Sequence, residues 1–158
     1  MTATPAMAFD DRIQICELLT RYYAAIDDRR LDRAAVDAAF TADGRWVGPT
    51  GVPRVGGAAI AAQQLEAMAL FRATHHVISD HLIEVDGDRA RVRANLTAMH
   101  LWAAGTTDPA ALESHFLAGG VFEGQAERTS AGWRVRELTL RITWRQGALP
   151  VHIRPNAV

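Results

Sequence analysis

Apolar residues in the first part of the chain recur at three- and four-residue intervals, which is the period of an amphipathic α-helix. The first run consists of Ile13, Cys16, Leu19, Tyr23 and Ile26. Asp10 or Asp11 suits its N-cap, because acidic groups favour the positive end of the helix dipole, and Asp27 lies at its end. Similar runs predict helices over residues 31–40 and 58–71. The third helix is expected to bury Ile60, Leu65, Met68 and Phe71.

Beyond residue 74 the apolar pattern changes to alternation, which is the period of a β-strand with one buried face. It is clearest over residues 89–102, where His100 falls among the apolar positions. Further strands are predicted over residues 74–85, 115–127 and 133–144. The segment 85–89, Val-Asp-Gly-Asp-Arg, predicts a hairpin. On the last strand, the apolar parity changes after Val135, which predicts a β-bulge or a change of neighbours.

The order of these elements indicates the fold class. Residues 48–57 hold four glycines and two prolines and predict a loop, and a short strand precedes it at residues 45–47. Helices followed by long strands favour an α+β fold, in which a strongly bent antiparallel or mixed sheet wraps around the N-terminal helices and encloses a conical cavity. We expect one domain over residues 9–146, a flexible tail over residues 1–8 and an irregular tail over residues 147–158.

Composition and charge narrow the possible partners. The net charge of −1 shows no basic excess, so we expect neither nucleic acid nor a membrane as partner. The single cysteine, Cys16, lies on an apolar helix face and is expected to be inert. No basic segment followed by an apolar core opens the sequence, and no apolar run approaches the ~20 residues of a membrane span. We therefore expect a cytoplasmic protein.

Motifs along nearly the whole chain resemble the SnoaL-like branch of the NTF2-like superfamily. They are Ile15-x-x-Leu18-x-x-x-Tyr22-x-x-x-x-Asp27, then Phe40-Thr-x-Asp-Gly44, then Thr74-His-His76 with Ile-Glu-Val-Asp-Gly-Asp-x-Ala90, and finally Gly132-Trp-Arg-Val. The resemblance implies an NTF2-like cone. Members include scytalone dehydratase, hexachlorocyclohexane dehydrochlorinase, bile-acid dehydratase and polyketide cyclases. The small subunits of ring-hydroxylating dioxygenases share the fold without catalysing a reaction.

The resemblance also implies a set of catalytic residues. The helix-end aspartate of the dehydratases matches Asp27, and their catalytic histidine matches His76. A second cavity histidine matches His100, and a cavity tyrosine five residues before the aspartate matches Tyr22. By spacing alone, however, Tyr23 shares the helix face of Asp27, because four residues make about one turn.

A second set of positions is implied to bind the substrate. A basic residue on the last strand resembles Arg141. Trp46 stands where scytalone dehydratase has a tyrosine. Phe122 and Gly120 fall near that enzyme's serine and asparagine, so the same substrate is not expected. We take Tyr23, Trp46, Arg141 and Phe122 as substrate-binding candidates.

The chemistry of the paired candidates indicates a general base. A neutral imidazole accepts protons near neutral pH, and a carboxylate behind it fixes its tautomer. Other interpretations stay open: Asp27 can end the helix as a turn residue, and His76 or His100 can be a structural core histidine. His75 is expected to face away from its neighbour. The histidines lack metal-ligand spacing, and the glycine-rich loop lacks a phosphate-binding pattern, so we expect no metal and no cofactor.

These observations predict a cofactor-independent lyase of the dehydratase type, or an isomerase or cyclase. The substrate is expected to be a small, mostly apolar cyclic or polyketide-like molecule. Two alternatives remain: a non-catalytic ligand-binding or assembly subunit with a filled cavity, and a water-activating hydrolase, such as an epoxide hydrolase, with a second carboxylate inside the cone. We also expect a homodimer or higher homo-oligomer.

Overall fold

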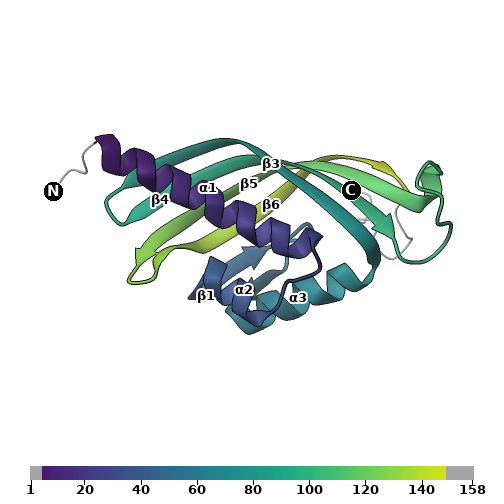
Figure 1. The fold of residues 1–158 in the computed structure, drawn as a ribbon, viewed down its shortest axis with the longest axis horizontal. Coiled ribbons are helices and arrows are strands. Elements are labelled where there is room, and N and C mark those ends of the chain that lie inside the picture. Colours follow the sequence, from purple (N-terminus) through teal and green to yellow (C-terminus); the bar gives the residue numbers. More distant parts are fainter. Residues whose placement is uncertain (1–4, 149–158) are drawn as a thin grey trace.

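The computed structural model describes residues 5–148 and contains helices followed by long strands (Figure 1). In chain order the elements are α1 (Pro5–Asp27), α2 (Arg33–Ala39), β1 (Phe40–Val47), β2 (Pro53–Val55), α3 (Gly57–Ala69), β3 (Phe71–Asp86), β4 (Arg89–Trp102), the 3₁₀ helix η1 (Leu112–Ser114), β5 (His115–Thr129) and β6 (Gly132–Gly147). None of the helices in this part of the chain combines the length and the apolarity needed to cross a bilayer.

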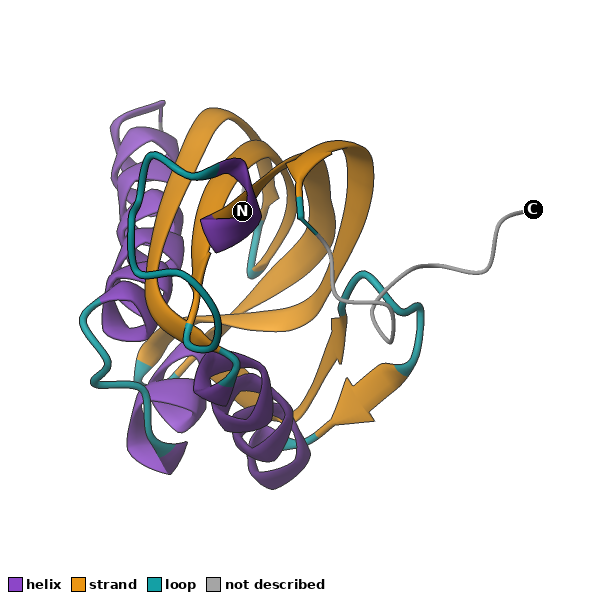
Figure 2. Cartoon of the chain, turned by 90° about the vertical axis from the view of Figure 1, so that its right-hand side faces the viewer, coloured by secondary structure: helices purple, strands orange, loops and turns teal. Residues whose placement is uncertain are grey.

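The six strands form one open mixed sheet in the order β2-β1-β6-β5-β4-β3. Strand β1 runs parallel to β6, and every other pairing is antiparallel. Figure 2 shows the long strands curling around an interior that the helices cover from one side. Helix α1 lies along the concave face against β3 and β6, and its C-terminal end reaches the first part of the edge strand β3.

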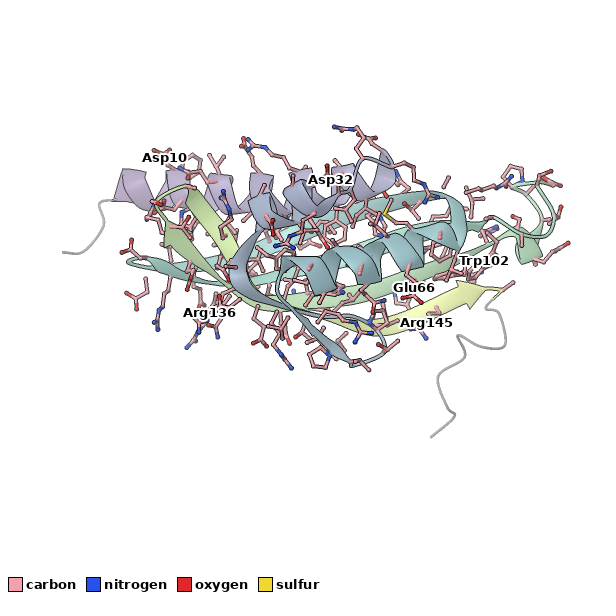
Figure 3. The ribbon with its side chains drawn as sticks, turned by 90° about the horizontal axis from the view of Figure 1, so that it is seen from below. Asp10, Asp32, Glu66, Trp102, Arg136 and Arg145 are labelled. Carbon is pink, nitrogen blue, oxygen red and sulfur yellow. The ribbon has the colours of Figure 1, made fainter. Side chains whose placement is uncertain are left out.

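The apolar core lies between α1, the other helices and the concave face of the sheet. Its largest fully buried members are Phe122, Ile15, Leu19, Ile60, Leu138 and Val36. Burying a side chain of this size contributes roughly 1.5–3 kcal/mol each. A second, smaller cluster of Trp102, Phe116 and Ala118, with Phe71 and Ile142 against it, lies at the end of the sheet remote from Asp10 (Figure 3).

Two local features of the sheet confirm the sequence pattern. The turn between β3 and β4 contains only Gly87 and Asp88, and Gly87 has a φ of +59°, which a glycine adopts at little cost. On β6, Arg136 has no partner between the pairs Val135–Ala126 and Glu137–Gln125, and this bulge accounts for the change of apolar parity.

The ends of several elements differ from the prediction. Helix α1 begins at Pro5, so Asp10 and Asp11 lie inside the helix instead of capping it, and residues 5–8 are helical instead of a tail. Two apolar positions assigned to the core, Ile13 and Leu65, are 43% and 47% exposed. The predicted loop contains the short strand β2, and β6 extends to Gly147. Residues 1–4 and 149–158 of the two expected tails lie outside the described residues.

Candidate active site

The candidate site lies where the last residue of α1 meets β3. One carboxylate oxygen of Asp27, Oδ1, is 2.6 Å from His76 Nδ1, and it also accepts a hydrogen bond of 2.7 Å from the Thr74 hydroxyl. The other oxygen, Oδ2, accepts a 2.8 Å hydrogen bond from the main-chain N–H of His76. The Asp27 side chain is 18% exposed and that of His76 is 10% exposed. The structure therefore joins the two residues that the sequence paired.

The helix end is held at this place by Arg29. This residue has a φ of +59°, which turns the chain away at the C-terminal end of α1. Its guanidinium donates hydrogen bonds to the carbonyl oxygens of Met68, at 2.6 Å, and Phe71. Because these carbonyls flank the start of β3, the contact fixes the end of α1 against the strand that carries His76.

The hydrogen bonds that Asp27 accepts determine the charge of its carboxyl group. Burial raises the pKa of Asp27, but the hydrogen bonds from the side chain and main chain of His76 and from Thr74 outweigh it and hold the pKa below its ordinary value. Asp27 is therefore ionised at neutral pH and has no proton to donate. It follows that Nδ1 of His76 carries the shared hydrogen, which leaves Nε2 as the free, basic nitrogen.

His100 lies beside the pair on β4. Its ring centroid is 5.3 Å from that of His76 at an interplanar angle of 89°, and it stacks on Phe116 at 4.3 Å. Burial, together with the neighbouring His76, lowers the pKa of His100 to about 3, so this imidazole is neutral over the physiological range. Its Nδ1 is buried without a hydrogen-bond partner among the described residues. His100 thus lies on the buried face, as predicted.

Of the two tyrosines, Tyr23 lies nearer to the histidines. Its ring centroid is 5.2 Å from that of His76, whereas the ring of Tyr22 packs on Tyr23 and on Phe40. Burial raises the pKa of both phenols, so both hydroxyls remain protonated. The Tyr23 hydroxyl has no hydrogen-bond partner in the described part of the chain, whereas the Tyr22 hydroxyl lies beside the Gln64 side chain. The spacing argument for Tyr23 therefore holds better than the family match to Tyr22.

The remaining substrate-binding candidates separate into an inner and an outer group. Trp46 and Phe122 are buried, with ring centroids 6.0 Å apart, and Phe122 also lies 5.2 Å from Tyr23. Arg141, by contrast, is exposed on the outer face of β6, opposite Val121. Its neighbours Leu138 and Leu140 pack into the core on the other face. The structure thus contradicts a place for Arg141 inside the cone.

Two hollows of the described structure lie away from the carboxylate–imidazole pair. One of about 410 Å³ lies between α1, α2 and the β5–β6 turn and is lined in part by Tyr22 and Trp133. Another of about 560 Å³ lies on the charged outer face of the sheet near Arg91 and Glu123. The hydroxyl oxygen of Tyr23 and Nδ1 of His100 are themselves buried. A buried polar group without a protein partner is ordinarily satisfied by water or a ligand.

Activation of water by a second carboxylate and binding of a metal ion find less support in the site. Asp11, the carboxylate with the least exposure at 4%, accepts hydrogen bonds from Arg128 at 2.7 Å and Trp133 at 3.0 Å, and so is not free to activate water. Across the described residues, no group of three or more His, Cys, Asp or Glu side chains is arranged to hold a metal ion. His75 is exposed on the opposite face of β3 from His76, as the alternation predicts.

Sequence reasoning did not assign a role to Thr74, although it was part of the quoted motif. The signal was present, because residues two apart on a strand share a face, and Thr74 therefore lies beside His76. The pairing of Asp11 with Arg128 could not be read in the same way, since these residues come from distant segments of the chain.

The chain matches the SnoaL-like domain over residues 7–139, which is most of its length. It belongs to the SnoaL-like family. No curated protein gives a match to the sequence. Solved structures of the NTF2-like superfamily have the same helices followed by an open mixed sheet, so the predicted fold is confirmed.

Three solved structures illustrate the likeness. The Kfla4162 protein of Kribbella flavida is 26% identical, with a TM-score of 0.77 over 88% of this chain and 95% of that one. A candidate scytalone dehydratase of Novosphingobium aromaticivorans is 17% identical, with a TM-score of 0.77 over 96% and 100%. A Type 2 hexachlorocyclohexane dehydrochlorinase is 14% identical, with a TM-score of 0.70 over 94% and 98%. At these identities the last two show a shared fold.

Proposed function

We propose that this SnoaL-like protein is a cofactor-independent lyase or isomerase in which Asp27 and His76 form the general base. The observation that carries the proposal is the 2.6 Å contact between Asp27 Oδ1 and His76 Nδ1, made by a carboxylate that is ionised at neutral pH. The names of two fold relatives, a dehydratase and a dehydrochlorinase, agree with elimination chemistry.

The reaction begins with proton removal by His76. Its Nε2 accepts a proton from a carbon next to a carbonyl or a leaving group, and Asp27 stabilises the imidazolium that results. Loss of water or halide then gives an alkene, which is lyase chemistry, whereas return of the proton to another carbon is isomerisation. His100 and Tyr23, both neutral, serve as hydrogen-bonding groups for the oxygen or leaving group of the substrate.

The surroundings of the base favour a small and mostly apolar substrate. Phe122 and Trp46 supply aromatic surface next to Tyr23. Asp27 carries the one negative charge at the pair, and Arg141 is too far outside to neutralise an anionic substrate there. A cyclic or polyketide-like molecule without a charge fits this combination.

The test uses the two adjacent histidines as a matched pair. His76→Ala removes the base, while His75→Ala removes an exposed imidazole from the other face of the same strand. Each variant is incubated in D₂O with a panel of cyclic ketones, β-hydroxy ketones and halogenated cyclohexanes, and deuterium uptake and product are followed by NMR. We expect His76→Ala to lower the rate by roughly 10²–10⁴ and His75→Ala to leave it unchanged. Undiminished exchange in His76→Ala would refute the proposal.

The enclosed core supports a second candidate, a non-catalytic ligand-binding or assembly subunit. Phe122 is fully buried beside Tyr23, and the hollows near Trp133 and near Arg91 lie elsewhere. In that case no compound of the panel undergoes exchange with the wild-type protein, while some of them bind saturably in a calorimetric titration.

A further inference from the structure

Three hydrogen bonds reach the carboxylate of Asp27, and all three come from a short segment of β3. Two of the donors belong to His76, and the third is the Thr74 hydroxyl. The main-chain N–H of His76 fixes Oδ2, and the Thr74 hydroxyl fixes Oδ1. Two donors on different oxygens determine the plane of a carboxylate, so Asp27 cannot rotate about its Cβ–Cγ bond without breaking one of them.

Which group donates in the hydrogen bond between Thr74 and Asp27 follows from which of the two carries a hydrogen. A hydroxyl has one hydrogen, and an ionised carboxylate can only accept, so the Thr74 hydrogen is committed to Oδ1. The β-branched side chain has few χ1 rotamers in a strand, which restricts the directions in which the hydroxyl can point. Thr74 therefore presents a preformed donor to the same oxygen that faces the imidazole.

We propose that Thr74 is a positioning residue of the base: its hydroxyl holds Asp27 Oδ1 in line with His76 Nδ1, which keeps Nε2 free to accept the substrate proton. The role rests on the proposed function, in which His76 is the base. Thr74 acts through Asp27 and not through the substrate, so its loss should lower kcat and leave KM nearly unchanged.

The first experiment needs no substrate and compares three variants of the full chain. The Asp27 carboxyl is titrated by ¹³C NMR, and the exchange of the His76 Nδ1 proton with water is followed by ¹⁵N-edited NMR. Thr74→Val keeps the shape of the side chain and removes the hydrogen-bond donor, whereas Thr74→Ser keeps the donor and removes the methyl group. Thr97→Val is the control, because it makes the same substitution at an exposed position on β4.

We expect Thr74→Val to raise the pKa of Asp27 by about one unit, because the ionised form loses one of its hydrogen bonds. We also expect the Nδ1 proton to exchange at least about tenfold faster. Thr74→Ser and Thr97→Val should behave as the wild type. If Thr74→Val does not fold, Thr74→Ala takes its place in the same measurements.

Two results would overturn the assignment. The first is an Asp27 titration and proton exchange unchanged in Thr74→Val or Thr74→Ala. The second is a Thr74→Ser variant as perturbed as Thr74→Val, which would show that the methyl group matters and that the role is packing. Failure of the proposed function gives a different pattern. In that case His76→Ala keeps full activity, while Thr74→Val still raises the pKa of Asp27 and still speeds the exchange of the His76 Nδ1 proton.

Discussion

Two aspartates on the same helix, one buried and one half-buried, have different partners. Near the start of α1, Asp11 accepts hydrogen bonds from Arg128 and Trp133. At its end, Asp27 accepts hydrogen bonds from His76 and Thr74. Hydrogen bonds outweigh burial and lower the pKa in both carboxyls. What separates them is the chemistry of the partner: a guanidinium can only donate hydrogen bonds, whereas an imidazole also has a ring nitrogen that can accept a proton.

Arg128 cannot lose its proton under physiological conditions, so its bond to Asp11 is permanent. Its guanidinium also contacts Asp88 and lies 4.6 Å from the centroid of Trp133, which ties α1 to both hairpin ends of the sheet. An imidazole gains and loses a proton at moderate pH. We propose that the Asp11 cluster serves stability and the Asp27 cluster serves proton transfer, and substitutions of the two aspartates test this division.

Asp27→Asn should have the largest effect on activity. The His76 main-chain N–H would still bind the amide oxygen, so the amide NH₂ would face Nδ1 and force the proton onto Nε2. We expect the rate of substrate deuteration to fall by roughly 10²–10⁴, while the free energy of unfolding changes by no more than about 1 kcal/mol. Chemical denaturation together with the exchange assay measures both. A large loss of stability with normal exchange would reverse the assignment of this aspartate.

Asp11→Ala should show the opposite pattern. Removing the carboxylate leaves the indole N–H of Trp133 buried and deprives Arg128 of one of its two acidic partners. We expect the free energy of unfolding to fall by about 3 kcal/mol with unchanged catalysis. Glu17→Ala is the control, because this residue forms an exposed pair with Arg21 and should cost at most about 1 kcal/mol. Equal losses in the two variants would contradict a stabilising role for the Asp11 cluster.

The smallest effect per pH unit concerns the neutral histidine beside the base. In the unfolded chain His100 takes up a proton near pH 6.5, whereas in the folded protein its pKa is about 3. The unfolded state therefore binds more protons in this window, and stability falls as the pH drops from 6.5 towards 3. His100→Gln should reduce this slope by at most about 1.4 kcal/mol per pH unit.

Urea unfolding between pH 7 and pH 4 measures the slope. Burial also lowers the pKa of His81, so some dependence on pH should remain in the variant. Asp27 loses its contribution only as the pH falls through its lowered pKa, which lies below 3.8. An identical slope in wild type and His100→Gln would show that His100 takes up its proton in the folded protein.

Much of the fold was predictable because it depends on local patterns. Alternation placed His100 on the buried face of β4 and His75 on the exposed face of β3, and the parity change on β6 located the bulge at Arg136. The start of α1 was missed because Asp10 and Asp11 looked like caps. In the structure Asp11 is instead turned into the core by Arg128, a residue of the distant β5.

The site was predictable as far as the carboxylate–imidazole pair and its neighbours Tyr23 and His100. Asp27 and His76 were paired through the family resemblance, and Tyr23 through helical spacing. Arg141 was misassigned because residue type was weighed above its position, although its alternation with Leu140 already indicated the outer face. The unpartnered hydroxyl of Tyr23, the parallel pairing of β1 with β6 and the position of the hollows depend on tertiary packing, which no local pattern carries.

The attachment of α1 to β3 by Arg29 has a consequence for how the protein would lose activity. The carboxylate and the imidazole come from segments separated by 49 residues, and the guanidinium contacts near the helix end keep those segments together. A fluctuation that lifts only this last turn would disassemble the base while leaving the strand ladder intact. Inactivation would then precede global denaturation, and the working lifetime of the protein would be governed by fraying at a single helix terminus.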